Sequence, residues 1–221
     1  GYFVENREYS ERLIEFFGDS ITAGYGNRST GNGFYTKDQD GLATYAVLAA
    51  QKLDAEISVV AASGKAINMN IWEADLKIPD LLNYTTFTNT ALYVTARIPQ
   101  VVVINGGAND APYINQATDS TDRKAREDAF VEAYAQFLQA IAEKYEGTTI
   151  LCCTDMMGEG SVIQPLIQEA ISRAAVENVH LLTLPSMYQD GEFGADGHPT
   201  VVTHQKAANI LEEKIRQIMG W

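Results

Sequence analysis

Five short apolar runs, each leading into a turn that carries Gly or Asp, constrain the fold of this chain more than any other feature. The runs lie at 13–17, 57–61, 101–105, 149–153 and 179–184. Between them, stretches such as 45–53, 125–145 and 162–176 place apolar residues three and four positions apart, which is the helical period. Short strands that alternate with helices form a parallel sheet covered on both faces. The pattern therefore predicts a three-layer α/β/α domain with a five-stranded parallel sheet.

The length of the chain fits one domain. Domains usually hold about 50 to 250 residues, and this chain has 221. We assign 11–221 to that domain and interpret the polar residues 1–10 as an arm or as the stub of an upstream domain. Thr200 is the expected N-cap of a last helix that ends at Met219. Residues 66–97 have no clear period, so we expect them to mix short helix and loop over the edge where the strands end.

The charge of the chain limits its partners. A formal net charge of -13 and an isoelectric point near 4.6 would repel phosphate backbones and anionic membrane surfaces. We therefore expect no nucleic-acid partner and no membrane partner, and no apolar run reaches the roughly 18 residues of a membrane span. Cys152 and Cys153 are adjacent in an apolar run and lack the spacing of metal ligands, so we interpret them as buried thiols.

Four of the predicted strands deliver polar motifs at their carboxyl ends, where open parallel sheets bind their ligands. The motifs are Gly-Asp-Ser at 18–20, Ser-Gly at 63–64, Gly-Ala-Asn-Asp at 107–110 and Asp-Gly-His-Pro at 196–199. Each one is short enough to arise by chance, so their order and their placement carry the signal. Asp19 and Asp110 are expected to brace the turns through hydrogen bonds to backbone amides.

A serine hydroxyl is a weak nucleophile unless a base takes its proton, and histidine has a suitable pKa for that task. Of the three histidines, His180 falls inside the fifth strand and His204 on the last helix, so we interpret both as structural or surface residues. His198 lies in a loop at the motif-bearing edge. Ser20 taken alone could equally be the cap of a helix.

The ordered set of motifs resembles the SGNH (GDSL-like) hydrolase family over about residues 12–218. The resemblance implies a flavodoxin-like SGNH hydrolase fold with strand order 2-1-3-4-5, with Ser20 as nucleophile and His198 as base. The oxyanion of the reaction would be held by the backbone N–H groups of Ser20 and Gly64 and by the side-chain amide of Asn109. The family uses neither a metal nor an organic cofactor.

The acid of a conventional triad is in doubt. The usual family spacing puts an Asp three residues before the histidine, and that position is Ala195 here. Asp196 could still orient His198, or a backbone carbonyl could do so in a Ser-His dyad. This departure, together with the residues at 14–26 and 194–199, resembles carbohydrate esterase family 2, whose members remove O-acetyl groups from polysaccharides.

The expected function is therefore a serine esterase that acts on O-acetyl groups of plant polysaccharides or oligosaccharides, in a secreted or cell-surface location. Tyr25, Trp72 and Tyr113 follow motif residues and are candidate sugar contacts, whereas the position between Asp and His, where an aromatic can pack on the sugar, is Gly197. Two alternatives stay open at this stage. One is a lipid-directed lipase, lysophospholipase or thioesterase, and the other is a glycan-binding module with weak or vestigial esterase activity. The oligomeric state is not predicted.

Overall fold

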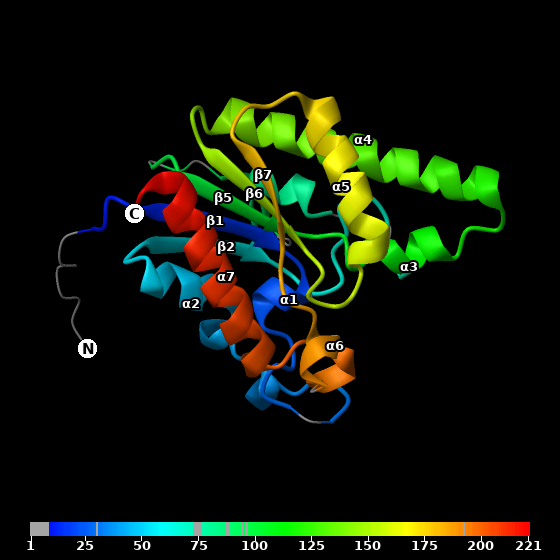
Figure 1. Ribbon diagram of the computed structural model, residues 1–221, viewed down its shortest axis with the longest axis horizontal. Coiled ribbons are helices and arrows are strands. Elements are labelled where there is room, and N and C mark those ends of the chain that lie inside the picture. The colour runs from blue at the N-terminus through cyan, green and yellow to red at the C-terminus, as the bar shows by residue number, and fades with distance from the viewer. Residues whose placement is uncertain are drawn as a thin grey trace.

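The computed structural model describes residues 9–29, 31–72, 77–86, 89–93, 95, 97–191 and 193–221. Its centre is a parallel sheet in the order β2-β1-β5-β6-β7 (Figure 1). The strands are β1 (Leu13–Gly18), β2 (Glu56–Ala61), β5 (Val101–Asn105), β6 (Thr149–Thr154) and β7 (Val179–Thr183). All five predicted strands are confirmed, with ends that differ by no more than one residue, and their order is the predicted 2-1-3-4-5.

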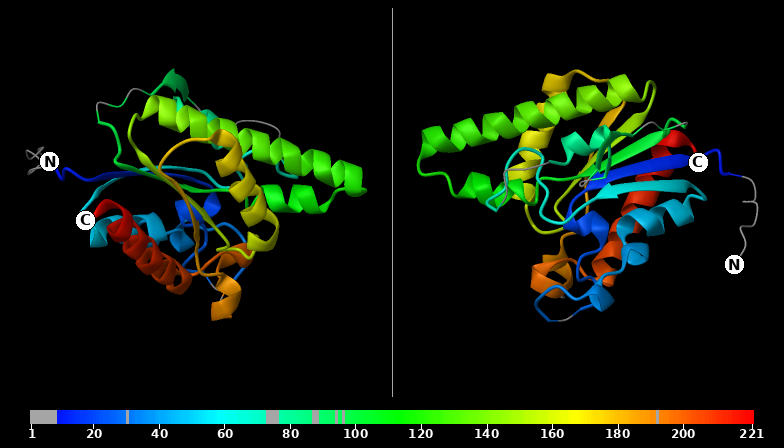
Figure 2. Two further views of the ribbon diagram at one scale, coloured as in Figure 1. Left: turned by 45° about the horizontal axis from the view of Figure 1, so that its top comes forward. Right: turned by 180° about the vertical axis from the view of Figure 1, so that it is seen from behind.

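Helices cover both faces of this sheet, which confirms the three-layer α/β/α fold of SGNH hydrolases (Figures 1 and 2). One face carries α2 (Tyr45–Lys52) and α7 (Val201–Met219), and the other carries α4 (Ser120–Lys144) and α5 (Gly160–Ala174). Since side chains alternate along a strand, Phe16 packs under the first pair and Phe17 under the second. The central strands are therefore apolar on both faces.

The described part of the segment 66–97 differs from the expectation. It contains a 3₁₀ helix, η3 (Pro79–Leu82), followed by an antiparallel hairpin of β3 (Tyr84–Thr86) and β4 (Asn89–Leu92) that the polar sequence did not reveal. The ammonium of Lys144, at the end of α4, donates to the carbonyl of Leu82. Because α4 ends just before β6 begins, this part lies toward the amino end of the sheet. The residues at 66–72 lie near the carboxyl edge together with Ile78, whose N–H donates to the carbonyl of Ala66 at 2.9 Å.

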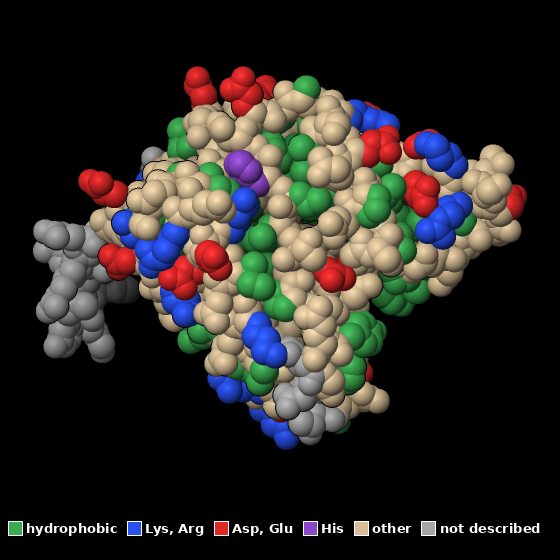
Figure 3. All heavy atoms as spheres, viewed as in Figure 1, with side chains coloured by type: hydrophobic (Ala, Val, Ile, Leu, Met, Phe, Trp, Pro, Cys, Tyr) green, Lys and Arg blue, Asp and Glu red, His purple; other side chains and the backbone are tan. Residues whose placement is uncertain are grey.

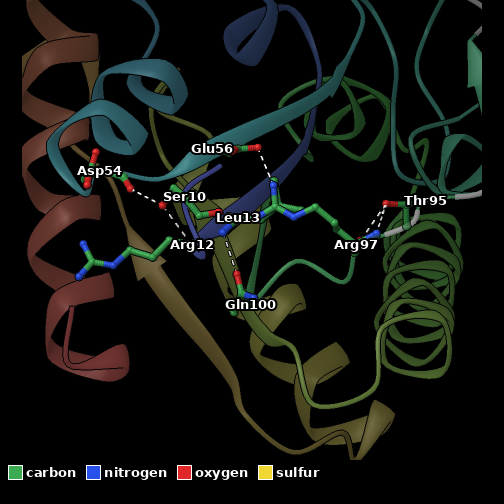
Figure 4. A network of polar contacts seen from close by, with 8 residues as sticks. All are labelled: Ser10, Arg12, Leu13, Asp54, Glu56, Thr95, Arg97 and Gln100. Carbon is green, nitrogen blue, oxygen red and sulfur yellow. Dashed lines mark hydrogen bonds and ion pairs between the residues drawn. The ribbon is translucent and has the colours of Figure 1, made fainter. Parts of the chain in front are cut away.

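A polar network fastens the start of β1 at the amino end of the sheet (Figure 4). Arg97 donates to Glu56 at 2.6 Å and to the carbonyl of Ser10 at 2.6 Å, while Gln100 accepts from the N–H of Leu13 at 2.7 Å. The hydroxyl of Ser10 also donates to the carbonyl of Asp54 at 2.7 Å. Ser10 is thus tied to the domain, while residues 1–8 of the expected arm lie outside the described residues.

The remaining short helices are α1 (Ser20–Ala23), α3 (Asp110–Asn115) and α6 (Met187–Asp190), and further 3₁₀ turns are η1 (Thr36–Asp38), η2 (Gly41–Ala43) and η4 (Ala195–Gly197). Cys152 and Cys153 are free and fully buried in β6, as predicted. Lys and Arg side chains lie among Asp and Glu side chains on the face seen in Figure 3. Among the helices of the described residues, none combines the length and apolarity needed to span a bilayer.

Candidate active site

Ser20 lies at the carboxyl edge of the sheet, as the first residue of α1 directly after β1. Asp19, rather than Ser20, caps this helix, because its Oδ1 accepts from the backbone N–H of Ile21 at 3.0 Å. The tight entry into α1 requires Gly18, since a Cβ there would lie 2.0 Å from Oγ1 of Thr22. The turn thus presents the Ser20 hydroxyl at the edge while another side chain satisfies the helix start.

His198 contacts Ser20 directly. Its Nε2 lies 2.8 Å from Oγ of Ser20, and its Nδ1 lies 3.0 Å from the carbonyl oxygen of Ala195. Because a carbonyl can only accept, Nδ1 carries the proton and Nε2 keeps a lone pair that accepts from the hydroxyl. Burial lowers the pKa of His198 below its usual value and so favours the neutral ring. This is the form that can take a proton from a serine.

Asp196 is occupied by contacts other than the His198 ring. Its Oδ2 accepts from the phenol of Tyr25 at 2.7 Å, and its Oδ1 accepts from the backbone N–H of Gly33 at 3.0 Å. These two bonds hold the pKa of Asp196 below its usual value. Of the two arrangements that the sequence left open, the structure has the backbone carbonyl of Ala195 at Nδ1 of His198.

Tyr25, a predicted sugar contact, lies against the imidazole. The ring centroids of Tyr25 and His198 are 4.4 Å apart, with 36° between the ring planes. The ring of Phe34 also packs near Tyr25, with 5.7 Å between the two ring centroids and 45° between the ring planes. The hydrogen bond to Asp196 raises the pKa of the Tyr25 phenol. Sequence reasoning had not singled out Phe34, which is 64% exposed.

The three predicted oxyanion donors follow three neighbouring strands. Ser20 follows β1, Gly64 follows β2 and Asn109 follows β5, and these strands are adjacent in the order β2-β1-β5. The Nδ2 of Asn109 donates to the carbonyl of Lys65 at 3.1 Å and to Oδ2 of Asp19 at 3.3 Å. The structure therefore joins the strand ends that carry Ser20, Gly64 and Asn109 at one edge.

The loop after Gly64 is held by Asp110, whose carboxylate accepts from three backbone N–H groups at 2.8 to 3.0 Å. The donors are Ile67, Asn68 and Met69. With the Asp19 cap, these bonds confirm the predicted bracing roles of both aspartates. Burial raises the pKa of Asp19 to about 7 and that of Asp110 to about 6, since these carboxyl groups are enclosed at the edge.

Asn70 is a further residue of this loop that sequence reasoning missed. Its Nδ2 donates to the carbonyl of Gly64 at 2.6 Å, and its Oδ1 accepts from the N–H of Trp72 at 2.8 Å. An asparagine in a polar stretch gave no signal of this contact. Asn70 connects the loop at Gly64 to Trp72, and Trp72 is 63% exposed.

Tyr113, the third predicted sugar contact, packs within the protein. The guanidinium of Arg126 lies over its ring at 4.3 Å and donates to its carbonyl at 2.5 Å, while Asp122 accepts from the same guanidinium at 2.8 and 2.9 Å. One face of the Tyr113 ring is thus covered. Tyr25 is likewise half-buried, whereas Trp72 is 63% exposed.

His204 is structural, as predicted. It is 1% exposed on α7, its Nδ1 accepts from the N–H of Tyr45 at 3.2 Å, and its ring is parallel to that of Tyr45 within 4°. Burial lowers the pKa of His204 to about 3, so the ring is neutral at physiological pH. His180 is a half-buried residue of β7.

The geometry resembles that of enzymes that form an acyl-serine. A hydroxyl and a neutral imidazole lie at hydrogen-bond distance, and a third group orients the imidazole. The three predicted oxyanion donors follow adjacent strands at the edge that carries the hydroxyl, and donors at such an edge could stabilise an oxyanion. The arrangement can therefore support nucleophilic acyl transfer.

Comparison with known proteins finds relatives that are named as esterases. The chain is 32% identical to the cellulase/esterase CelE of Acetivibrio thermocellus over 96% of this chain and 26% of CelE. It is 25% identical to an acetylxylan esterase/glucomannan deacetylase of Cellvibrio japonicus, over 95% of this chain and 60% of that protein. The chain thus spans less than two thirds of either relative.

A solved family two carbohydrate esterase from Clostridium thermocellum, in complex with cellohexaose, has the same fold. Its TM-score is 0.86 at 29% identity, covering 99% of this chain and 67% of that one. The profile of the GDSL-like Lipase/Acylhydrolase family matches residues 16–206, which include every predicted catalytic and oxyanion residue. On this match, the chain belongs to the GDSL-like lipase/acylhydrolase family.

Proposed function

We propose that this chain is a serine esterase that removes O-acetyl groups from plant polysaccharides or oligosaccharides. The observation that carries the proposal is the contact of Ser20 Oγ with Nε2 of His198 at 2.8 Å, with Nδ1 held by Ala195. A hydroxyl with this partner is activated for attack on an acyl carbon. The family to which the chain belongs is one of acylhydrolases.

In the first half of the proposed reaction, Nε2 of His198 takes the proton of Ser20 as Oγ attacks the acetyl carbon. The N–H groups of Ser20 and Gly64 and the amide of Asn109 donate to the oxyanion that forms. Asn109 reaches it by exchanging its 3.3 Å contact with Asp19, the longer of its two bonds. As the carbon–oxygen bond to the alcohol breaks, the imidazolium returns the proton to the leaving oxygen.

In the second half, His198 takes a proton from water, and the resulting hydroxide attacks the acetyl-serine. The second oxyanion collapses, the bond to Oγ breaks, and Ser20 regains its proton from the imidazolium. The products are the free enzyme and acetic acid, which releases its proton to solvent as acetate. Each half uses the same three donors and the same base, so the chemistry needs neither a metal nor an organic cofactor.

The acetylated-carbohydrate substrate is supported by the named activities of the relatives, two of which are acetylxylan esterases/glucomannan deacetylases. The exposed aromatic residues Phe34 and Trp72 near the site suit a sugar, whose C–H faces pack on rings. We extend the proposal to a secreted or cell-surface location, where polysaccharides occur. A lipid substrate is less favoured because the relatives are carbohydrate esterases.

The test is acetate release from acetylated xylan and glucomannan oligosaccharides by the wild-type chain, by Ser20→Ala and by Ser172→Ala. Ser172 lies on α5, where its hydroxyl donates to the carbonyl of Gln168, so it is a matched serine control. Release by wild type and Ser172→Ala, with loss in Ser20→Ala, is expected. Preference for octanoyl over acetyl nitrophenyl esters would move the assignment to a lipid esterase, and sugar binding without turnover would move it to a glycan-binding module.

A further inference from the structure

The carboxylate of Asp196 joins two segments that are far apart in the sequence. One oxygen accepts from Tyr25, 171 positions away, and the other accepts from Gly33, 163 positions away. Asp196 itself belongs to the short turn η4 that ends at His198. A single side chain therefore connects the loop that carries the histidine to the loop that follows α1.

The rings beside this carboxylate form a small aromatic wall, which we define as Tyr25 and Phe34. Tyr25 lies between its two neighbours, with its ring 4.4 Å from that of His198 and 5.7 Å from that of Phe34. Its phenol is fixed by Asp196, and the N–H of Gly33 next to Phe34 is fixed by the same carboxylate. Both members of the wall are thus held through one side chain.

The reaction places the alcohol part of the ester on this side of the site. In the proposed mechanism, Nε2 of His198 hands its proton to the leaving alkoxide, so the alcohol must depart next to the imidazole. The aromatic wall flanks that imidazole, and Phe34 is 64% exposed. Pyranose rings present apolar C–H faces that pack on aromatic side chains.

We propose that Asp196 is a positioning residue that holds the Tyr25–Phe34 wall beside His198, where it binds the sugar on the alcohol side of the ester. The inference rests on the proposed function, since it assigns the wall to a carbohydrate leaving group. It gives Asp196 a role distinct from that of a triad acid. A triad acid acts on every ester through the imidazole, whereas the wall acts on esters whose alcohol is large enough to reach it.

The test compares two substrates, 4-nitrophenyl acetate and an acetylated xylo-oligosaccharide, in Asp196→Ala and Asp196→Asn. Alanine removes both contacts, so KM for the oligosaccharide is expected to rise about tenfold or more, with kcat/KM for the aryl ester within about threefold of wild type. Asparagine can accept from Gly33 and donate to Tyr25, so it should restore most of the loss. If Asp196 were a triad acid, Asp196→Asn would instead lower the activity on both substrates, because an amide cannot replace the carboxylate of a triad.

Matched controls separate this effect from backbone strain. Asp196 has φ 51°, in the left-handed region that alanine disfavours, and Asp54 has the same φ of 51° at the other end of the sheet. Asp54→Ala therefore reports the conformational cost alone. Tyr25→Phe should raise the oligosaccharide KM by a smaller factor than Asp196→Ala because the Gly33 bond remains. Tyr188→Phe removes the hydroxyl of a tyrosine that is 64% exposed and should change nothing.

Amide hydrogen exchange gives a readout that needs no substrate. The peptide spanning 28–36 should exchange faster in Asp196→Ala than in wild type, Asp196→Asn or Asp54→Ala, because the Gly33 N–H loses its acceptor. Unchanged exchange, or an equal loss on both esters that Asn does not rescue, overturns the proposal. If wild type hydrolyses the aryl ester but not the oligosaccharide, the proposed carbohydrate function fails, and the sugar-binding part of this inference fails too. The exchange result does not change that conclusion.

Discussion

The carbonyl oxygen of Ala195 accepts from Nδ1 of His198 at 3.0 Å, across only three positions in the same turn. A backbone carbonyl is a neutral acceptor, so it fixes the tautomer and orientation of the imidazole without adding a full negative charge beside it. The ring is also buried at its other edge against Ser20. Burial of the ring lowers the pKa of His198 below the usual value, although the bond to Ala195 acts in the opposite direction.

The pH dependence of esterase activity should follow from that pKa. His198 must be neutral to accept a proton, and a lowered pKa keeps it neutral to more acidic conditions than the usual value of 6.5. The kcat/KM for 4-nitrophenyl acetate should therefore rise with pH through a midpoint below 6.5 and be level above it. A profile measured in constant ionic strength checks this, and a midpoint above 6.5 would contradict it.

Asn109→Ala should impair the chemical step. Loss of one oxyanion donor typically lowers kcat about 100-fold or more, with a smaller effect on KM because the donor acts mainly in the transition state. Steady-state kinetics with 4-nitrophenyl acetate measure both constants. Asn115→Ala, at the exposed end of α3, is the control and should match wild type. If the kcat of Asn109→Ala is within threefold of wild type, the side-chain amide of Asn109 is not an oxyanion donor.

Acid should destabilise the protein through His204. Its folded-state pKa of about 3 lies below the unfolded value of 6.5, so the unfolded chain binds the extra proton between these limits. Stability from this residue is complete above pH 6.5 and is lost as the pH falls, on the order of 3 kcal/mol by pH 4. Urea unfolding of wild type and His204→Gln at several pH values should show their difference shrink toward low pH, whereas His180→Gln, which keeps His204, should still lose stability in acid.

Arg97→Ala should reduce stability without reducing activity. The guanidinium bonds to Glu56 and to the carbonyl of Ser10 at the amino end of the sheet, away from Ser20. Since the ion pair is partly exposed, we expect a loss of about 1 to 2 kcal/mol in the free energy of unfolding, most of it from the charged bond to the carbonyl. Arg173→Ala removes two exposed ion pairs, to Glu169 and Glu132, and should cost less than about 0.5 kcal/mol. A lowered kcat in Arg97→Ala would show that the two ends of the sheet are coupled.

The sheet was predictable from local sequence, and the candidate catalytic pair from an ordered set of motifs that resembles a known family. Apolar runs such as 101–105 identify buried strands, and the topology of a parallel sheet then gathers the residues that follow them, Ser20 and Asn109 among them, at one edge. The bracing roles of Asp19 and Asp110 followed from the same placement. These inferences needed no knowledge of distant contacts.

The details that escaped prediction depend on contacts between distant positions. The bonds of Asp196 to Tyr25 and Gly33 join residues more than 160 positions apart, and no local pattern reports them. The aromatic partner Phe34 and the bridging Asn70 belong to polar or irregular loops that share the same limitation. The β3–β4 hairpin was hidden because its short strands lack an apolar alternation.

The two adjacent thiols of β6 allow unfolding of the central sheet to be measured by chemical labelling. Cys152 and Cys153 are 0% exposed in β6, and burial raises the pKa of both, to about 12 for Cys152. A thiol that is neither exposed nor ionised resists alkylation and oxidation while the sheet is closed. Labelling by a maleimide therefore counts openings of the central sheet, so its rate reports kinetic stability with no dye or engineered residue.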